Sequence, residues 1–340
     1  MSVDIAIDFG TSKTVIYGNS RIILEEPTMI TVDSETFEPV YYGSDAKETL
    51  GRTPDTLMCI KPIEHGAIAD YDMAYSLMSK YMLKAFGNKI IRPRVMTCLP
   101  TNLTELQYRF MGKVLEESGG RSVLVIETPL AVALGVGIDF NEPKGSMVVD
   151  IGAGVTDIAT ISLGGIVQCD SFKVASNDFD DAIIKFVRRN FNIEIGPLTA
   201  ELIKKQVGTV VQRPVEITMV AKGRNLRSGL PEAFEISSDQ IYETLFDTAV
   251  AISNAVRRVI EKTDPDIVAD ITENGIHLTG GGSLINGMPQ FMQEFLGAKI
   301  IHAPDPSHSV IKGIGYAMKH PSILKKVDYQ IRSMKDLIIE

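Results

Sequence analysis

Apolar runs that stop at small, glycine-rich turns are the most regular feature of this chain. The first run, over residues 3–9, predicts a strand ending in Asp8, and a turn of small residues at 10–13 leads into a second apolar stretch. The same order returns downstream, where a strand at 146–149 is followed by an aspartate, a glycine turn and a return strand at 156–163. Because the whole unit of strand, aspartate, turn and strand occurs twice, we predict two related lobes.

Helical and strand patterns alternate between and after the two copies. Helices are predicted at residues 103–117, from 129 onward, and at 179–191, 200–207 and 239–262. Further strands are predicted at 122–126, within 215–236, and at 276–278, where a third glycine turn follows. This alternation predicts an α/β fold. No long polar linker separates the copies, so we expect the lobes to pack around a shared cleft.

Length, composition and charge agree with a large globular protein. The chain has 340 residues, which is long for one compact core and favours a two-lobed molecule. Its 44% hydrophobic and 23% charged residues are typical of a folded protein rather than a disordered or fibrous one. A formal net charge of -9 argues against a nucleic-acid binder, which would normally carry a basic face. We therefore expect no nucleic-acid partner.

Cysteine usage and the N-terminus bear on the compartment. Cys59, Cys98 and Cys169 are widely spaced and lack the close pairing of zinc sites or disulfide frameworks. We expect all three to be small core residues in a reducing compartment. The first residues form neither a basic nor an apolar leader segment, and no uncharged apolar run approaches the roughly 18 residues of a membrane span. The prediction is a cytoplasmic protein whose membrane contact can only be peripheral.

The glycine turns have the chemistry of phosphate binding. Small residues let backbone N–H groups converge on a phosphate, and the hydroxyls of Thr11 and Ser12 add further donors. Asp8 and Asp150 end the two incoming strands and supply hard oxygen for Mg²⁺, through water because this ion dehydrates reluctantly. Two such turns facing one another would clamp a nucleoside triphosphate between the lobes. The structural alternative is a pair of hairpins with strand-terminal aspartates.

Together these motifs resemble the actin superfamily, and specifically the MreB-type cell-shape proteins. The resemblance rests on the turns at residues 8–14, 150–157 and 278–284 and on the stretches at 26–28, 51–54, 60–62, 66–70 and 145–150. It covers nearly the whole chain, which makes it more specific than any single motif. It implies an actin-like, ribonuclease H-like α/β fold with two related lobes around a nucleotide cleft.

The resemblance also carries expectations for organisation and function. It implies a domain I at residues 1–142 with 313–340, a domain II at 143–312, and small subdomains at about 30–75 and 183–240. It implies a scaffold that binds ATP and Mg²⁺ and polymerises with itself into paired, antiparallel protofilaments. These filaments would lie at the inner face of the cytoplasmic membrane, where cell-shape or wall-synthesis proteins are the further partners.

Ligand-binding roles follow for individual residues. The phosphates are expected between the first and second turns and the adenosine beside the third, which nominates Gly10, Thr11, Ser12, Lys13, Gly152, Ala153, Gly154, Gly280, Gly281 and Gly282. Glu201 and Lys204 are nominated as sugar or base contacts, although the helix dipole and an ordinary surface lysine are the structural alternatives. Lys13 departs from the small polar residue usual at its position. It either strengthens phosphate binding or faces solvent.

The positions that activate water in related ATPases have lost the expected chemistry. An acidic or amide residue before the helix-opening proline and a threonine in the second turn are implied, but the chain has Thr128 and Val155 there. Val155 cannot hydrogen-bond, and Thr128 is a poor base that instead suits the N-cap of its helix. Glu127 and Thr156 could substitute, but strand alternation directs both away from these positions. We predict nucleotide binding with slow or absent hydrolysis.

Residues 86–94 predict a membrane-facing edge. Ile90 and Ile91 lie in a turn flanked by glycine and proline, with three cationic residues close by. Aliphatic side chains beside cations suit an interfacial anchor on anionic lipid. In MreB-type proteins that lack an N-terminal amphipathic helix, a hydrophobic loop at this place is the insertion element. The alternative is that the two isoleucines begin a buried strand that continues through Val95.

Two other functions share the same turns. A small-molecule kinase of this superfamily would use them equally well, but it needs an aspartate base in a substrate pocket, for which the sequence has no motif outside the turns. The division filament protein FtsA is the alternative among filament proteins, because the first turn, including Lys13, resembles the turn of FtsA. The stretch at residues 51–70 instead resembles MreB and argues against FtsA. Sedimentable filaments of purified protein would separate a scaffold from a kinase.

Overall fold

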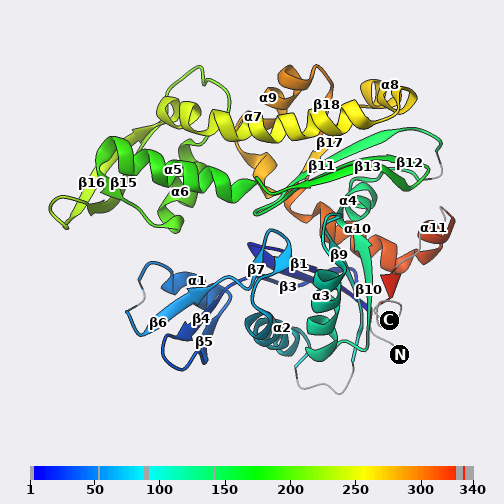
Figure 1. Cartoon of the computed structure of the whole chain (residues 1–340), viewed down its shortest axis with the longest axis horizontal. Helices are drawn as coiled ribbons and strands as arrows, with labels where there is room; N and C mark the ends of the chain where they lie inside the picture. The colour runs from blue at the N-terminus through cyan, green and yellow to red at the C-terminus, as the bar shows by residue number, and fades with distance from the viewer. Residues whose placement is uncertain (1–3, 53, 88–91, 141, 327–331, 334–340) are drawn as a thin grey trace.

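The computed structural model has two lobes, one above the other in Figure 1, each built on a central sheet. It describes residues 4–52, 54–87, 92–140, 142–326 and 332–333. The sheet of the first lobe is built from N-terminal strands and the C-terminal strand β19, and the sheet of the second lobe from strands between residues 146 and 302. Each sheet has helices on its outer face, and further helices fill the space between the sheets (Figure 1).

The sheet of the first lobe has six strands in the order β19-β10-β9-β1-β2-β3. Their bounds are β1 (Asp4–Phe9), β2 (Lys13–Gly18), β3 (Arg21–Pro27), β9 (Arg94–Leu99), β10 (Ser122–Glu127) and β19 (Arg332–Ser333). The first three are antiparallel neighbours, whereas β9 and β10 run parallel to β1. A mixed sheet with crossover connections confirms the predicted α/β class.

The sheet of the second lobe repeats this arrangement. Its order is β13-β12-β11-β17-β18, with β11 (Ser146–Ile151), β12 (Thr156–Ser162), β13 (Gly165–Phe172), β17 (Ile276–Thr279) and β18 (Ile300–His302). Strands β11 to β13 are antiparallel neighbours, and β17 and β18 run parallel to β11. Order and directions match β3-β2-β1-β9-β10, so the prediction of two related lobes is confirmed.

Helices cover the outer faces of both sheets and separate the inner faces (Figure 1). The outer helices are α2 (Tyr71–Phe86) and α3 (Glu105–Glu117) on the first lobe, and α7 (Ser238–Lys262), α8 (Pro265–Asn274) and α9 (Met288–Leu296) on the second. The middle helices are α4 (Thr128–Val136) and α10 (Ser309–Lys319). In β1, Ile5 and Ile7 pack in the outer core, whereas Ala6 packs against the middle helices. Strand alternation therefore supplies apolar side chains to both layers.

The two middle helices approach each other closely at glycines. A Cβ atom at Gly313 would lie 1.6 Å from the carbonyl oxygen of Ala131, and one at Gly135 would lie 1.9 Å from that of Ser309. No side chain fits at such distances, so backbone contacts backbone at this crossing. This contact joins a helix that follows β10 to one that follows the second-lobe sheet.

Two smaller sheets extend from the lobes on the left of Figure 1. One has the order β5-β4-β6, with β4 (Ile30–Asp33), β5 (Pro39–Tyr42), β6 (Leu57–Ile60) and the short helix α1 (Ser44–Thr49). The other has the order β14-β15-β16, with β14 (Ile193–Glu194), β15 (Thr218–Asn225), β16 (Pro231–Ser237) and the helices α5 (Ser176–Phe191) and α6 (Pro197–Val207). The domain boundaries given above stay a prediction.

Helix capping corrects two predictions. Thr104 is the N-cap of α3 and forms a capping box with Gln107, so the helix begins at Glu105, two residues later than predicted. Thr128, in contrast, is the first residue of α4, and Glu127 occupies the N-cap position without a side-chain cap. The predicted N-cap role of Thr128 is therefore wrong by one residue. Because β10 continues as far as Glu127, the chain enters the helix directly from the strand and Pro129 lies at the second helical position.

The cysteine and membrane predictions have mixed outcomes. Cys98 is buried, but Cys59 is only half-buried and Cys169 is exposed, so the core assignment is wrong for Cys169. That residue lies on β13, an edge strand with one face towards solvent. Ile90 and Ile91 lie outside the described residues. Among the described helices, none is both long and apolar enough to cross a membrane.

Candidate functional site

A cavity of about 710 Å³ is lined by residues of both lobes. Its wall includes residues from each predicted glycine turn, namely Gly10, Thr11, Ser12, Lys13, Gly152, Ala153, Gly154, Gly280, Gly281 and Gly282. Asp8, Asp150, Glu201 and Lys204 also line it. Segments far apart in the sequence therefore meet in one place, and the volume lies within the range of small-molecule and cofactor sites.

The first two glycine turns are built alike. In the first turn the Gly10 N–H donates to the Lys13 carbonyl oxygen at 3.1 Å. In the second turn the Gly152 N–H donates to the Val155 carbonyl oxygen at 2.9 Å. Each bond closes the hairpin between two antiparallel strands of its lobe. The two turns therefore present equivalent backbone to the cavity, as the sequence repeat predicts.

The short hairpin of β7 (Ile63–Glu64) and β8 (Ala67–Ile68) bridges the two turns. The Gly66 N–H donates to Thr11 Oγ1 at 3.1 Å. His65 Nδ1 lies 2.8 Å from the carbonyl oxygen of Gly154. Because Thr11 belongs to the first turn and Gly154 to the second, this hairpin holds the turns of the two lobes close together.

The third turn packs directly against Asp150. Gly280 has a φ of +86°, and a Cβ atom there would lie 2.4 Å from Asp150 Oδ1. Its N–H donates to the carbonyl oxygen of Pro306 at 3.0 Å. Both the backbone conformation and the close approach require glycine. The short helix η1 (Gly281–Leu284) that follows is thereby placed at the cavity wall.

Three carboxylates line the cavity: Asp150 and Asp157 are buried, and Asp8 is half-buried. Burial raises the pKa of Asp8 to about 6, although the charges of Lys13 and His308 act in the opposite direction. Burial, together with the negative charges of Asp157 and Asp8, holds the pKa of Asp150 well above its usual range. Buried carboxylates that repel each other are stabilised in their ionised form by a nearby cation.

These aspartates fit Mg²⁺ held through water. Mg²⁺ in nucleotide sites keeps several waters and takes one or two carboxylates together with phosphate oxygens. Within the described part of the chain, no cluster of three or more His, Cys, Asp or Glu residues could by itself hold a metal ion. A cation beside Asp8 and Asp150 would therefore depend on phosphate oxygens and water for its other ligands.

The two positions expected to activate water both line the cavity. Thr128 is 6% exposed and Val155 is 8% exposed. The hydroxyl of Thr156 donates to the carbonyl oxygen of Val174 at 2.8 Å, so it is used within the fold. Glu127 is not among the described residues that line the cavity. The side chains at these two positions thus offer one hydroxyl and one apolar group.

Lys204 is more buried than an ordinary surface lysine, with a side chain only 9% exposed. Its ammonium donates to the carbonyl oxygen and the hydroxyl of Ser176, each at 2.9 Å, and to Asp180 Oδ2 at 2.7 Å. These bonds use its three protons and fasten α6 to the start of α5. The surface-charge alternative is therefore wrong, and a sugar or base contact by Lys204 stays a prediction.

Glu201 accepts hydrogen bonds from both sides. Lys205 lies 2.6 Å away on the same helix, and Lys47 reaches it from α1 at 3.0 Å. Partial burial acts to raise the pKa of Glu201, but the bonds from Lys205 and Lys47 outweigh it and lower the pKa to about 2. The carboxylate is therefore ionised at neutral pH and links the small sheets of the two lobes.

Lys13 lies beside the first phosphate turn and also faces solvent, so it combines the two alternatives given for it above. It lines the cavity, yet its side chain is 33% exposed and its ammonium lies 2.6 Å from Glu25 Oε1. His308 Nε2 lies 3.5 Å from the same ammonium and 3.1 Å from Glu25 Oε2. The cation thus sits at the cavity rim, beside the first turn and already paired with a carboxylate.

Several cavity residues are not nominated by reasoning from sequence: Cys98, Asp157, Arg213, Leu284 and Asn286. Asp157 and Leu284 lie at the ends of the second and third turns, whereas the other three belong to no motif. A usable signal existed for Cys98. Strand β9 runs parallel to β1, so residues at its C-terminal end reach the same sheet edge as Asp8. No spacing rule connects Arg213 or Asn286 with the turns.

The duplicated sheets, the close-packed middle helices and three glycine turns around one cavity define an actin-like protein. The chain matches the family model "MreB/Mbl protein" over residues 2–326. It is 36% identical over 330 residues to the cell shape-determining protein Mbl of Bacillus cereus, a match that covers 95% of this chain and 98% of that protein. It is also 36% identical over 325 residues to the cell shape-determining protein MreB of Escherichia coli, covering 94% of each. The chain belongs to the MreB/Mbl family.

Solved structures agree with this assignment. The crystal structure of Spiroplasma citri MreB5 bound to ADP superposes with a TM-score of 0.90 at 32% identity, covering 97% of this chain and 99% of that one. The structure of MamK in a double helical filament has a TM-score of 0.80 at 19% identity, covering 94% and 99%, and supports the fold alone. The predicted resemblance is thus confirmed, and the protein is an actin-like cell-shape cytoskeletal protein.

Proposed function

We propose that this chain binds ATP with Mg²⁺ in the cavity between its lobes and polymerises into cell-shape filaments. The observation that carries the proposal is the meeting of three glycine turns with Asp8 and Asp150 on one cavity. The family relative MreB5 of Spiroplasma citri has been solved with ADP and with AMPPNP, which supports an adenine nucleotide as the ligand. The weakened water-activating positions favour binding with slow hydrolysis.

Self-association is the second part of this proposal. We infer that subunits form protofilaments that pair in an antiparallel way, in the cytoplasm and peripheral to the membrane. Wall-synthesis or other cell-shape proteins would be the further partners. The family relatives Mbl and MreB are cell shape-determining proteins, and this supports a scaffold role for the chain.

Sedimentation of the purified chain tests the proposal. With Mg-ATP the protein is expected in the high-speed pellet, and negative-stain microscopy of the same sample should show filaments. A parallel sample with EDTA controls for aggregation, because nonspecific aggregates do not need Mg²⁺. A protein that binds Mg-ATP tightly but stays in the supernatant at every protein concentration would contradict a scaffold role. Such a result would favour the small-molecule kinase alternative.

The membrane edge is a separate prediction from residues 86–94. Changing Ile90→Ser together with Ile91→Ser is expected to abolish co-sedimentation with anionic liposomes, because the aliphatic pair would no longer enter the acyl region. Affinity for Mg-ATP should not change. As a matched control, Ile22→Ser removes an exposed isoleucine, 39% exposed on β3, and should leave liposome binding intact. A double variant that unfolds would show instead that the pair belongs to the core.

A further inference from the structure

The cavity is lined not only by the phosphate turns but also by residues that follow α6 and η1. Lys204 is fixed beside the second turn, because its partner Ser176 donates its N–H to the carbonyl oxygen of Gly152 at 3.1 Å. Gly208, which caps α6, lies four residues further along the helix axis, a rise of about 6 Å. It lines the same cavity together with Arg213 and Asn286. A nucleotide whose phosphates lie at the turns would extend its sugar and base in this direction.

The cavity wall formed by these residues is well fixed. The Val210 N–H donates to the carbonyl oxygen of Asn286 at 3.0 Å, and Thr209 Oγ1 lies 3.1 Å from Asn286 Oδ1. Thr209 Oγ1 also donates to the carbonyl oxygen of Val211 at 2.6 Å. These bonds hold residues 208–213 against residues 284–287. Side chains on both segments are therefore positioned relative to each other without a ligand.

Arg213 and Leu284 are two large side chains that line the cavity from these segments. Arg213 is half-buried, and its Nη2 donates to the carbonyl oxygen of Gly208 at 3.2 Å. Among the described residues no carboxylate lies within ion-pair distance of its guanidinium, unlike Lys13, Lys47 and Lys204. Leu284 lines the cavity with 58% of its surface exposed. A planar cation and an exposed apolar side chain thus line the cavity from two segments that are hydrogen-bonded to each other.

We propose that Arg213 recognises the nucleotide base, with its guanidinium packed on a purine ring and Leu284 covering apolar surface of the same ring. This inference rests on the proposed nucleotide site. Arginine suits the role because its guanidinium is planar, always charged and able to stack on aromatic systems. A cation over a conjugated ring is attracted electrostatically, and more strongly where water is excluded. The Gly208 bond fixes the guanidinium before the ligand arrives, which lowers the entropy cost of the contact.

The proposal separates base recognition from phosphate recognition. Arg213→Met keeps the length of the side chain but removes the planar cation. Calorimetric titration should show affinity for Mg-ATP weakened by roughly 5- to 30-fold, the range for a cation–π contact in a partly dry site. Affinity for Mg-tripolyphosphate, which has the phosphates but no base, should stay within twofold of the wild type. Arg213→Lys should recover only part of the ATP affinity, because a lysine ammonium cannot stack as a plane.

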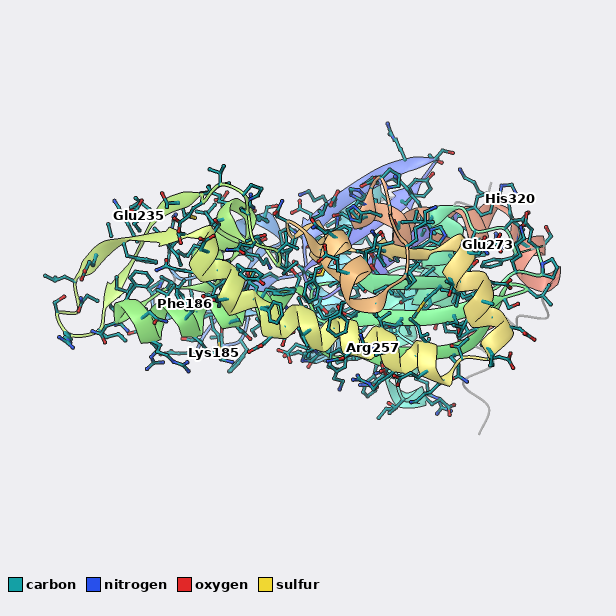
Figure 2. The ribbon with its side chains drawn as sticks, turned by 90° about the horizontal axis from the view of Figure 1, so that it is seen from above. Lys185, Phe186, Glu235, Arg257, Glu273 and His320 are labelled. Atoms are coloured by element: carbon teal, nitrogen blue, oxygen red, sulfur yellow. The ribbon has the colours of Figure 1, made fainter. Side chains whose placement is uncertain are left out.

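Arg257→Met is the matched control. Arg257 also donates through Nη2 to a backbone carbonyl oxygen, that of Phe295 at 2.7 Å, and packs on an aromatic ring. It lies on α7 at the outer surface of the second lobe (Figure 2). Its removal should leave both affinities unchanged. Thermal unfolding of all variants verifies that they fold, and Arg213→Lys keeps the test decisive where Arg213→Met is unstable.

Two outcomes would overturn the proposal. ATP affinity unaffected by either Arg213 substitution would place the base elsewhere. An equal loss for ATP and tripolyphosphate would make Arg213 a general attractor of phosphate rather than a base contact. A wild-type protein that binds no nucleotide would contradict the proposed function itself, which distinguishes that failure from the failure of this inference.

Discussion

Replacing Asp150 with asparagine is expected to weaken Mg²⁺-dependent ATP binding by roughly 10- to 100-fold, a loss typical when a group that orients metal ligands is removed. The substitution keeps the shape of a side chain whose Oδ1 lies against Gly280, but removes the negative charge that a cation needs. Calorimetric titration with Mg-ATP measures the loss. In EDTA, wild type and variant should bind ATP with similar affinity, because the substitution acts on the binding of Mg²⁺, which EDTA removes.

The stability of the same variant provides a control. Burial and neighbouring charges raise the pKa of Asp150 well above its usual 3.8, so folding disfavours the ionised form. A raised pKa means that the ligand-free fold loses stability as pH rises above the ordinary Asp range. At pH 7, Asp150→Asn should therefore unfold at the same temperature as the wild type or a higher one. An Asp150→Asn protein that is stable and binds Mg-ATP normally would place the cation elsewhere.

The topology could be predicted because its signal is local and repeated. An aspartate at the end of a strand, two residues before a glycine that closes a hairpin, is visible in sequence around both Asp8 and Asp150. The structure gives the two turns the same hydrogen bond and the two sheets the same strand order. Backbone sterics at a tight turn act over a few residues, so no distant contact is needed to recognise them.

The side-chain partners of the site could not be predicted in the same way. Glu201 was nominated as a sugar or base contact, but its bond to Lys47 joins residues 154 positions apart on different lobes. No periodicity links α1 with α6, since their proximity depends on how the lobes pack. The burial of Lys204 likewise follows from Asp180 on a neighbouring helix, because a buried ammonium needs acceptors that the local sequence does not reveal.

Two smaller errors concern a helix boundary and the burial of a cysteine. Thr128 has the residue type of an N-cap, but β10 runs straight into α4 and moves the cap to Glu127. Cys169 was expected in the core because cysteine is usually buried. Its strand β13 lies at a sheet edge, where alternate side chains face solvent. Both errors come from tertiary context that overrides a residue preference.

Hydrolysis is expected to be slow in the wild type and to rise when the lost chemistry is restored. Thr128 and Val155 both line the cavity, but neither can polarise an attacking water. Combining Thr128→Glu with Val155→Thr should raise the ATP turnover rate by about 10² to 10⁴, the usual contribution of general-base assistance. Thr128 is the first residue of α4, where the helix dipole favours a carboxylate, and Val155→Thr keeps the side-chain volume.

A phosphate-release assay on the two single variants and the double variant completes a mutant cycle. The double change should exceed the product of the single changes, because a base and a hydroxyl that act on one water are coupled. Glu127→Gln and Thr156→Val are the controls in the wild-type background. Neither should lower the residual rate, since Glu127 is absent from the described cavity wall and the Thr156 hydroxyl is bonded to Val174.

Three results would contradict this mechanism, each for a different physical reason. Wild-type turnover at the level of active relatives would mean that another group holds the water, and a drop with Glu127→Gln would identify it. If the rate gain of the double variant equals the product of the two single gains, the two side chains act on separate steps. No gain in the double variant, with Mg-ATP affinity unchanged, would mean that lobe closure or polymerisation limits the rate rather than the chemical step.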